Sequence, residues 1–126
     1  MRAREKKSRT FTFVMLWDQV AWVAGCTDYY YVAQGQTPES CIECLQSGLY
    51  LTAKWNEMED RDPWEATNSG PEHVPPEFTD TDSACTYDPN SAGDDHTKTY
   101  TGQITVEWEV PTATDKKSWK ARGRGW

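Results

Sequence analysis

The sequence lacks the features that mark several large classes of protein. No stretch of about 18 uncharged apolar residues occurs in its 126 residues, so no membrane-spanning helix is predicted. It has only two histidines, His73 and His96, and contains no nucleophile-elbow, zinc-protease, phosphate-loop or dinucleotide-binding motif. These absences argue against the common catalytic machineries, and we expect a protein that is not an enzyme.

Basic residues are scarce in the middle of the chain. Residues 10–115 contain three basic residues and 19 acids, whereas residues 1–9 contain five basic residues and one acid. Residues 116–126 contain five basic residues and no acid, and the net charge of the chain is −7. We therefore expect a basic N-terminal arm over 1–9, an acidic body over 10–115 and a basic tail over 116–126, because segments of opposite charge prefer different partners.

Alternating apolar residues predict the strands of this body. Residues 10–17 and 99–111 alternate most clearly, and residues 28–33 and 48–58 also have strand character. Hydrophobic residues make up 37% of the chain and aromatic residues 13%, a composition that excludes collagen-like, coiled-coil and wholly disordered chains. A chain of this length is long enough to bury one core.

One helix is predicted among these strands. Thr37 is suited to be its N-cap, Pro38 its first residue and Gly48 its stop, which places the helix at about 38–47. Residues 59–97 are acidic, carry five prolines and show no periodicity, so they form either a long surface arm or a set of short pieces. The predicted fold class is mainly β: a small antiparallel sheet or sandwich with one short helix, a long acidic irregular segment and basic terminal arms.

The four cysteines, Cys26, Cys41, Cys44 and Cys85, leave three states open. Cys41 and Cys44 have the spacing of a zinc knuckle, so a zinc site is one of them, although no cofactor is expected. An even count in a small, loop-rich domain also suits disulfides. The third state is unpaired buried thiols, because Cys41 and Cys44 lie on the helix face that should meet the core.

The segment before Cys26 allows a further interpretation. This segment resembles a bacterial lipoprotein signal, because a basic stretch and an apolar stretch are followed by Val23-Ala24-Gly25-Cys26. Asp18 and Gln19 interrupt the apolar stretch, which is costly for such a signal. An ordinary strand and loop is the favoured interpretation.

The charge layout leads to the functional hypothesis. We expect a structural or interaction protein of a large assembly, with a virus or phage particle as that assembly and with copies of itself or other structural subunits as partners. The alternatives are a small nucleic-acid-binding module in the cytoplasm, whose basic and aromatic side chains meet phosphates and bases, and a secreted or surface ligand-binding domain stapled by disulfides. The residues predicted to contact partners or nucleic acid are Arg2, Arg4, Lys6, Lys7, Arg9, Lys116, Lys117, Trp119, Lys120, Arg122, Arg124 and Trp126.

Overall fold

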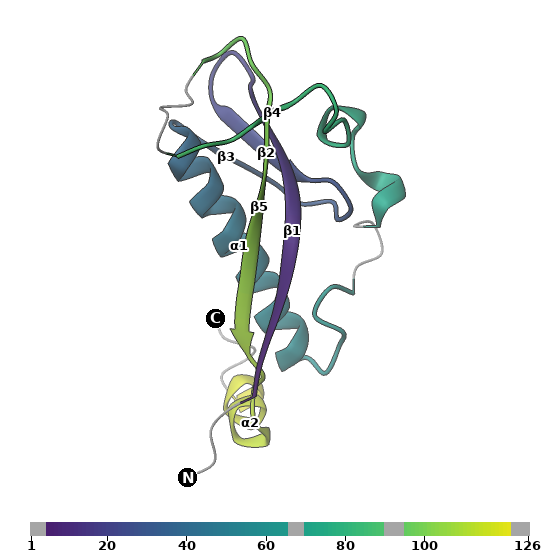
Figure 1. The fold of residues 1–126 in the computed structure, drawn as a ribbon. Helices are drawn as coiled ribbons and strands as arrows, with labels where there is room; N and C mark the ends of the chain where they lie inside the picture. The colour runs from purple at the N-terminus through teal and green to yellow at the C-terminus, as the bar shows by residue number, and fades with distance from the viewer. Residues whose placement is uncertain (1–4, 66–69, 90–94, 122–126) are drawn as a thin grey trace.

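The computed structural model describes residues 5–65, 70–89 and 95–121, which form one sheet with a long helix on one face (Figure 1). The first three strands are β1 (Lys6–Trp17), β2 (Trp22–Cys26) and β3 (Val32–Gly35). They are followed by helix α1 (Pro38–Met58) and by two 3-10 turns, η1 (Pro71–His73) and η2 (Pro76–Phe78). The last elements are β4 (Cys85–Thr86), β5 (Tyr100–Glu109) and helix α2 (Ala113–Ala121).

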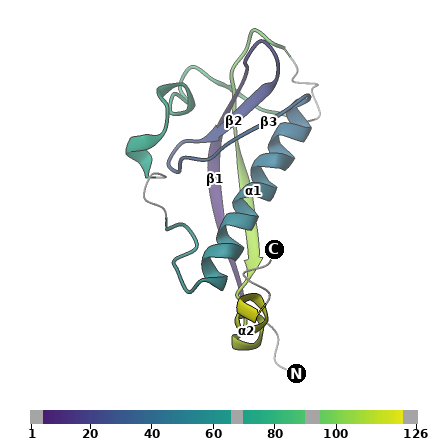
Figure 2. The same ribbon diagram turned by 180° about the vertical axis from the view of Figure 1, so that it is seen from behind.

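The five strands lie in the order β3-β2-β1-β5-β4. All neighbours are antiparallel except β4 and β5, which run parallel. β1 pairs with β5 from Lys6↔Glu109 to Met15↔Tyr100, but it pairs with β2 only from Phe13 onward. Both views therefore show β1 and β5 continuing beyond the other strands, as a two-stranded ribbon that reaches α2 (Figures 1 and 2).

The main core lies between the sheet and α1. The alternating residues predicted to share one face of β1, namely Phe11, Phe13, Met15 and Trp17, all pack on the main core. Trp17 is partly buried, and the first three are almost completely buried. In β5 the same holds for Ile104, Val106 and Trp108. They meet a stripe of α1 residues that recurs every four positions and is fully buried: Cys41, Leu45, Leu49 and Ala53.

A smaller cluster covers part of the other face of the sheet. Val14 of β1 packs there against Val74 and Phe78, with Leu16 and Val23 at its margin. Val74 and Phe78 belong to the proline-rich segment 59–97, whose described residues form short pieces laid against their own sheet. Of the two interpretations of this segment, the structure supports the set of short pieces.

Helix α1 begins where the sequence predicts but ends eleven residues later. The backbone N–H of Ser40 donates to the Thr37 hydroxyl and the N–H of Thr37 donates to Ser40 Oγ, which confirms Thr37 as the N-cap. Gly48 was expected to stop the helix, yet it lies within it. A Cβ at this position would collide with the Tyr31 side chain, so Gly48 serves close packing. The predicted strand over 48–58 is wrong, because the four-residue stripe of α1 continues through these residues.

The fold class is therefore only partly as predicted. A five-stranded sheet with a helix is present, but the longer α1 and the additional α2 make the protein a mixed α/β fold rather than a mainly β one. The predicted strand over 28–33 is also misplaced, since two strands, β2 and β3, lie on either side of most of it. Within the described residues, neither helix is both long and apolar enough to cross a membrane.

Candidate functional site

The N-terminal basic residues that the structure describes are part of the sheet. Lys6, Lys7 and Arg9 lie in β1, so the predicted arm over 1–9 is not separate from the body at these positions. Lys7 Nζ lies 3.3 Å from Glu57 Oε2 of α1, and Arg9 Nη2 donates to Asp28 Oδ2 at 3.2 Å. Two of the three basic side chains thus pair with acids of the same chain, while Arg2 and Arg4 lie outside the described residues.

The guanidinium of Arg9 also closes an aromatic cluster at one end of the core. It lies over the rings of Phe11, Tyr29 and Trp64, 4.5 to 5.9 Å from their centroids. Trp64 makes edge contacts with Phe11, Tyr29 and Trp108. Arg9 therefore covers the end of this core as well as pairing with Asp28.

The predicted C-terminal tail is a helix over much of its length. Thr112 caps α2, because the Thr112 hydroxyl accepts from the Asp115 N–H and the Asp115 carboxylate accepts from the Thr112 N–H. Lys117 is exposed on α2, and Arg122, Arg124 and Trp126 lie outside the described residues.

Helix α2 is held against the end of α1. Lys116 Nζ donates to Asp60 Oδ1 at 2.6 Å, and Lys120 Nζ lies 3.7 Å from Asp60 Oδ2. Trp119 Nε1 donates to Glu59, and its ring lies 6.2 Å from that of Trp55. The hydrogen bond and charge of Lys116, with a smaller effect of Lys120, hold the pKa of the Asp60 carboxyl below its usual range.

All four cysteines are free thiols in the structure. Cys26 and Cys41 are buried, whereas Cys44 and Cys85 are exposed. Burial raises the pKa of both buried thiols to about 12. Within the described residues, no group of three or more His, Cys, Asp or Glu side chains is placed to hold a metal ion.

The outer edge of β5 is open over most of its length. β4 pairs with β5 only at Tyr100 and Thr101. The carbonyls of Thr99 and Thr101 accept hydrogen bonds on this side, so the odd-numbered residues of β5 direct their backbone N–H and C=O outward. Along the described chain, no strand covers this edge from Gly102 to Glu109.

Helix α1 runs beside this open edge and turns it into a groove. Glu39, Ile42, Gln46 and Tyr50, spaced by three and four residues, form the stripe of α1 that lines it. Gln46 Nε2 donates to the Thr105 carbonyl of this edge at 2.7 Å. We call the space between Gly102–Glu109 and this stripe the β5-edge groove.

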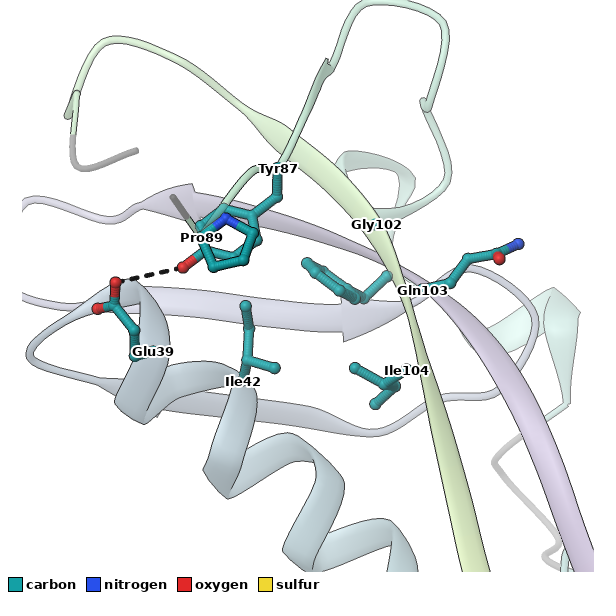
Figure 3. A pocket seen from close by; sticks show the side chains of 8 residues that line it. Glu39, Ile42, Tyr87, Pro89, Gly102, Gln103 and Ile104 are labelled. Atoms are coloured by element: carbon teal, nitrogen blue, oxygen red, sulfur yellow. Dashed lines mark hydrogen bonds between the residues drawn. The ribbon is translucent and has the colours of Figure 1, made fainter. Parts of the chain in front are cut away.

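One end of the β5-edge groove is apolar. There a cavity of about 340 Å³ is lined mainly by Phe13, Ile42, Tyr87, Pro89 and Ile104 (Figure 3). The Tyr87 hydroxyl donates to Glu39 Oε1 at 3.3 Å across its mouth, and burial together with the Glu39 charge raises the pKa of Tyr87.

A glycine keeps this apolar end open. Gly102 lies over the Phe13 ring, and a Cβ on Gly102 would come 2.9 Å from Phe13 Cζ. A larger residue at position 102 would thus displace the ring that lines the cavity. Figure 3 shows Gln103 pointing away from the cavity, as expected for the next residue of a strand.

The rest of the groove is polar and acidic. Two further cavities follow along β5, one beside Thr105 and Val106 and one beside Trp108 and Glu109; Tyr50 and Glu107 line both. Three carboxylates, Glu39, Glu107 and Glu109, lie in the lining of the groove against one ammonium group, Lys6. The groove therefore combines outward backbone groups, an apolar end and negative charge.

Comparison with known proteins adds no relative from which a function could be carried over. No family model, curated protein or solved structure matches this chain. The β5-edge groove was also missed by the sequence interpretation, which placed the predicted contacts on the basic ends. The alternation of residues 99–111 identified the strand, but it carries no information on which neighbour, if any, pairs with each edge.

Proposed function

We propose that this protein is a non-catalytic structural subunit of a large assembly, and that the assembly is a virus or phage particle in which it serves as a shell, decoration or tail protein. The observation that carries the proposal is the open edge of β5. A long unpaired edge presents a row of hydrogen-bonding groups that invites pairing with another chain. In a large assembly, a neighbouring chain would cover the edge of β5 and form hydrogen bonds with its backbone groups.

Exposed apolar side chains on α1 support a protein partner. Tyr50 lines the β5-edge groove, and Leu51 and Trp55 of the same helix are 49% and 38% exposed. Aromatic residues are enriched where proteins meet, because they bury a large area with few rotatable bonds. Copies of this chain or other structural subunits are the partners that we propose for these surfaces.

The ion pairs of the basic residues favour protein over nucleic acid as the partner. Lys7, Arg9, Lys116 and Lys120 each pair with a carboxylate of the same chain. Binding to phosphates would have to break these pairs before any counterion release could drive association. The choice of a virion rests on the charge layout of the sequence, in which basic ends flank an acidic middle, by analogy with small shell and tail proteins.

Mass measurement of the full chain tests the assembly role. We expect sedimentation velocity at rising concentration, and in fractions from the native source, to give a defined particle much heavier than the 14.4 kDa chain. A chain that stays monomeric in both preparations would overturn the proposal. Release of bound oligonucleotide from the particle by salt would instead support the nucleic-acid alternative.

A further inference from the structure

We propose that the β5-edge groove binds an extended, basic segment of a partner protein, which adds to the sheet as a sixth strand beside β5. This inference rests on the proposed interaction function and names the chemistry of the partner. An extended segment fits because the groove offers backbone donors and acceptors, with the side chains of α1 as its second wall. The hydrogen bonds come from Gln103, Thr105 and Glu107, whose backbone groups point outward.

Gln46 shows that this edge can accept a hydrogen bond from outside the sheet. Its side-chain amide donates to the Thr105 carbonyl at 2.7 Å, where an added strand would place a backbone N–H. Gln46 is itself exposed, so a partner can displace this amide without unpacking the core. The side chain therefore occupies the edge while the groove is empty and gives way when a strand is added.

The two faces of the added strand would meet different surroundings. Side chains opposite Gly102 and Ile104 would point toward the apolar cavity between Ile42 and Tyr87. Side chains opposite Glu107 and Glu109 would lie on the other face, next to two carboxylates. We therefore expect the partner segment to carry an apolar residue, with Lys or Arg three and five positions away from it. Residues an odd number of positions apart point to opposite faces of a strand.

A seven-residue peptide that alternates lysine with apolar residues, Lys-Val-Lys-Ile-Lys-Val-Lys, is a suitable probe because it reads the same in both directions. We expect the full chain to bind it, with amide shifts in ¹⁵N spectra centred on Gln103, Thr105 and Glu107. The same peptide with glutamate in place of lysine should bind at least about tenfold more weakly. Binding of both peptides with equal affinity, or shifts centred elsewhere, would overturn the inference.

N-methylation of the peptide tests strand addition on the unaltered protein. Alternate N–H groups of a strand point to opposite edges, so methylating one set should abolish binding and methylating the other should leave it nearly unchanged. Loss of binding when the lysine amides are methylated would indicate antiparallel addition. Loss of binding when the amides of the apolar residues are methylated would indicate parallel addition. Equal effects of the two sets would rule out a sixth strand.

A matched pair of variants separates the contribution of the Glu107 backbone N–H to peptide binding from that of its charge. Glu107→Pro removes the outward N–H and the carboxylate, and proline is tolerated on an edge whose N–H faces solvent. Glu107→Gln removes only the charge. We expect a loss of at least about tenfold for the first and about threefold for the second, with unchanged thermal melts as the control.

These experiments distinguish failure of the inference from failure of the proposed function. If the chain is monomeric in its native source but binds the peptide as described, the groove inference is supported and the proposed assembly role is contradicted. If the Glu107→Pro variant forms particles normally and the unaltered chain does not bind the peptide, the proposed assembly role is supported and the groove inference is overturned.

Discussion

Single residues of one type have different environments in this fold, and the cysteines show it most clearly. Cys26 lies in β2 and Cys41 on the buried stripe of α1, whereas Cys44 faces outward only one turn later. Thiol reactivity follows the thiolate fraction, and for a pKa of about 12 that fraction at pH 8 is on the order of one in ten thousand. The two buried cysteines should therefore be inert in the native state.

We predict that iodoacetamide at pH 8 adds two groups to the folded chain, on Cys44 and Cys85. In denaturant it should add four, because all four thiols are free. Intact-mass spectrometry with peptide mapping measures both. Rapid native labelling of Cys26 or Cys41 would contradict the burial described above, and fewer than four groups in denaturant would reveal a disulfide.

Two leucines of α1 provide a matched test of the core. Leu45 is fully buried between the helix and the sheet, whereas Leu51 is 49% exposed. We predict that Leu45→Ala lowers the free energy of unfolding by about 2–5 kcal/mol, because it leaves a cavity in a packed core. Leu51→Ala should change it by no more than about 0.5 kcal/mol in the same urea titration. Similar effects of the two substitutions would contradict the assigned burial.

Among the elements, α2 depends most on a few polar contacts. It has no buried residue of its own and is held by Asp60, Glu59 and the Trp55 ring. The pKa of Asp60 is lowered in the folded chain, so its contribution to docking is present above the ordinary carboxyl value of 3.8. That contribution is lost as the pH falls through the lower, folded value.

We predict that Asp60→Asn exposes the amides of residues 113–121 to faster hydrogen exchange at neutral pH. The unaltered chain should show the same loss of protection only when the pH is taken below about 4. Asp82→Asn, an exposed acid from a different segment, is the matched control and should leave α2 protected. Unchanged exchange of α2 in Asp60→Asn would mean that the two lysine contacts do not hold the helix.

At the scale of the whole molecule, several basic side chains near the two ends are paired with acids of the same chain. Lysine and arginine side chains at both ends meet acids of the body, and the open β5 edge offers backbone groups whose hydrogen bonds depend little on salt. An assembly built through that edge should therefore differ in salt response from a nucleic-acid complex, whose affinity falls steeply with ionic strength.

We predict that raising sodium chloride from 50 to 500 mM releases no nucleic acid from the native particle, whatever loss of protein mass follows from screening of the charged β5-edge groove. Sedimentation velocity recorded at 260 and 280 nm measures both quantities at once. Dissociation in salt with release of material absorbing at 260 nm would contradict the prediction and support binding to nucleic acid through the basic residues.

Much of the local structure could be read from short stretches of sequence. The alternation in residues 10–17 and 99–111 identified the two longest strands and their buried faces, and Thr37 and Pro38 located the start of α1. These signals depend on contacts within a few residues and held at these positions, whereas the local signals over 48–58 predicted a strand where α1 continues. The Thr112–Asp115 cap of α2 is a signal of the same kind that the interpretation of a free tail passed over.

The length of α1, the placement of the basic ends and the open edge of β5 depend on contacts between residues far apart in the sequence. Gly48 lies within a helix because the buried stripe of α1 continues past it, with Tyr31 packed where a Cβ would be. The basic ends are held by pairing of β1 with β5 and by the nearby acids Glu57, Asp28 and Asp60. The candidate site is of this kind too, since the free edge of β5 follows from the short pairing with β4 and from the path of α1. Periodicity shows which face of a strand is buried, but strand partners and edges are set by the packing of the whole chain.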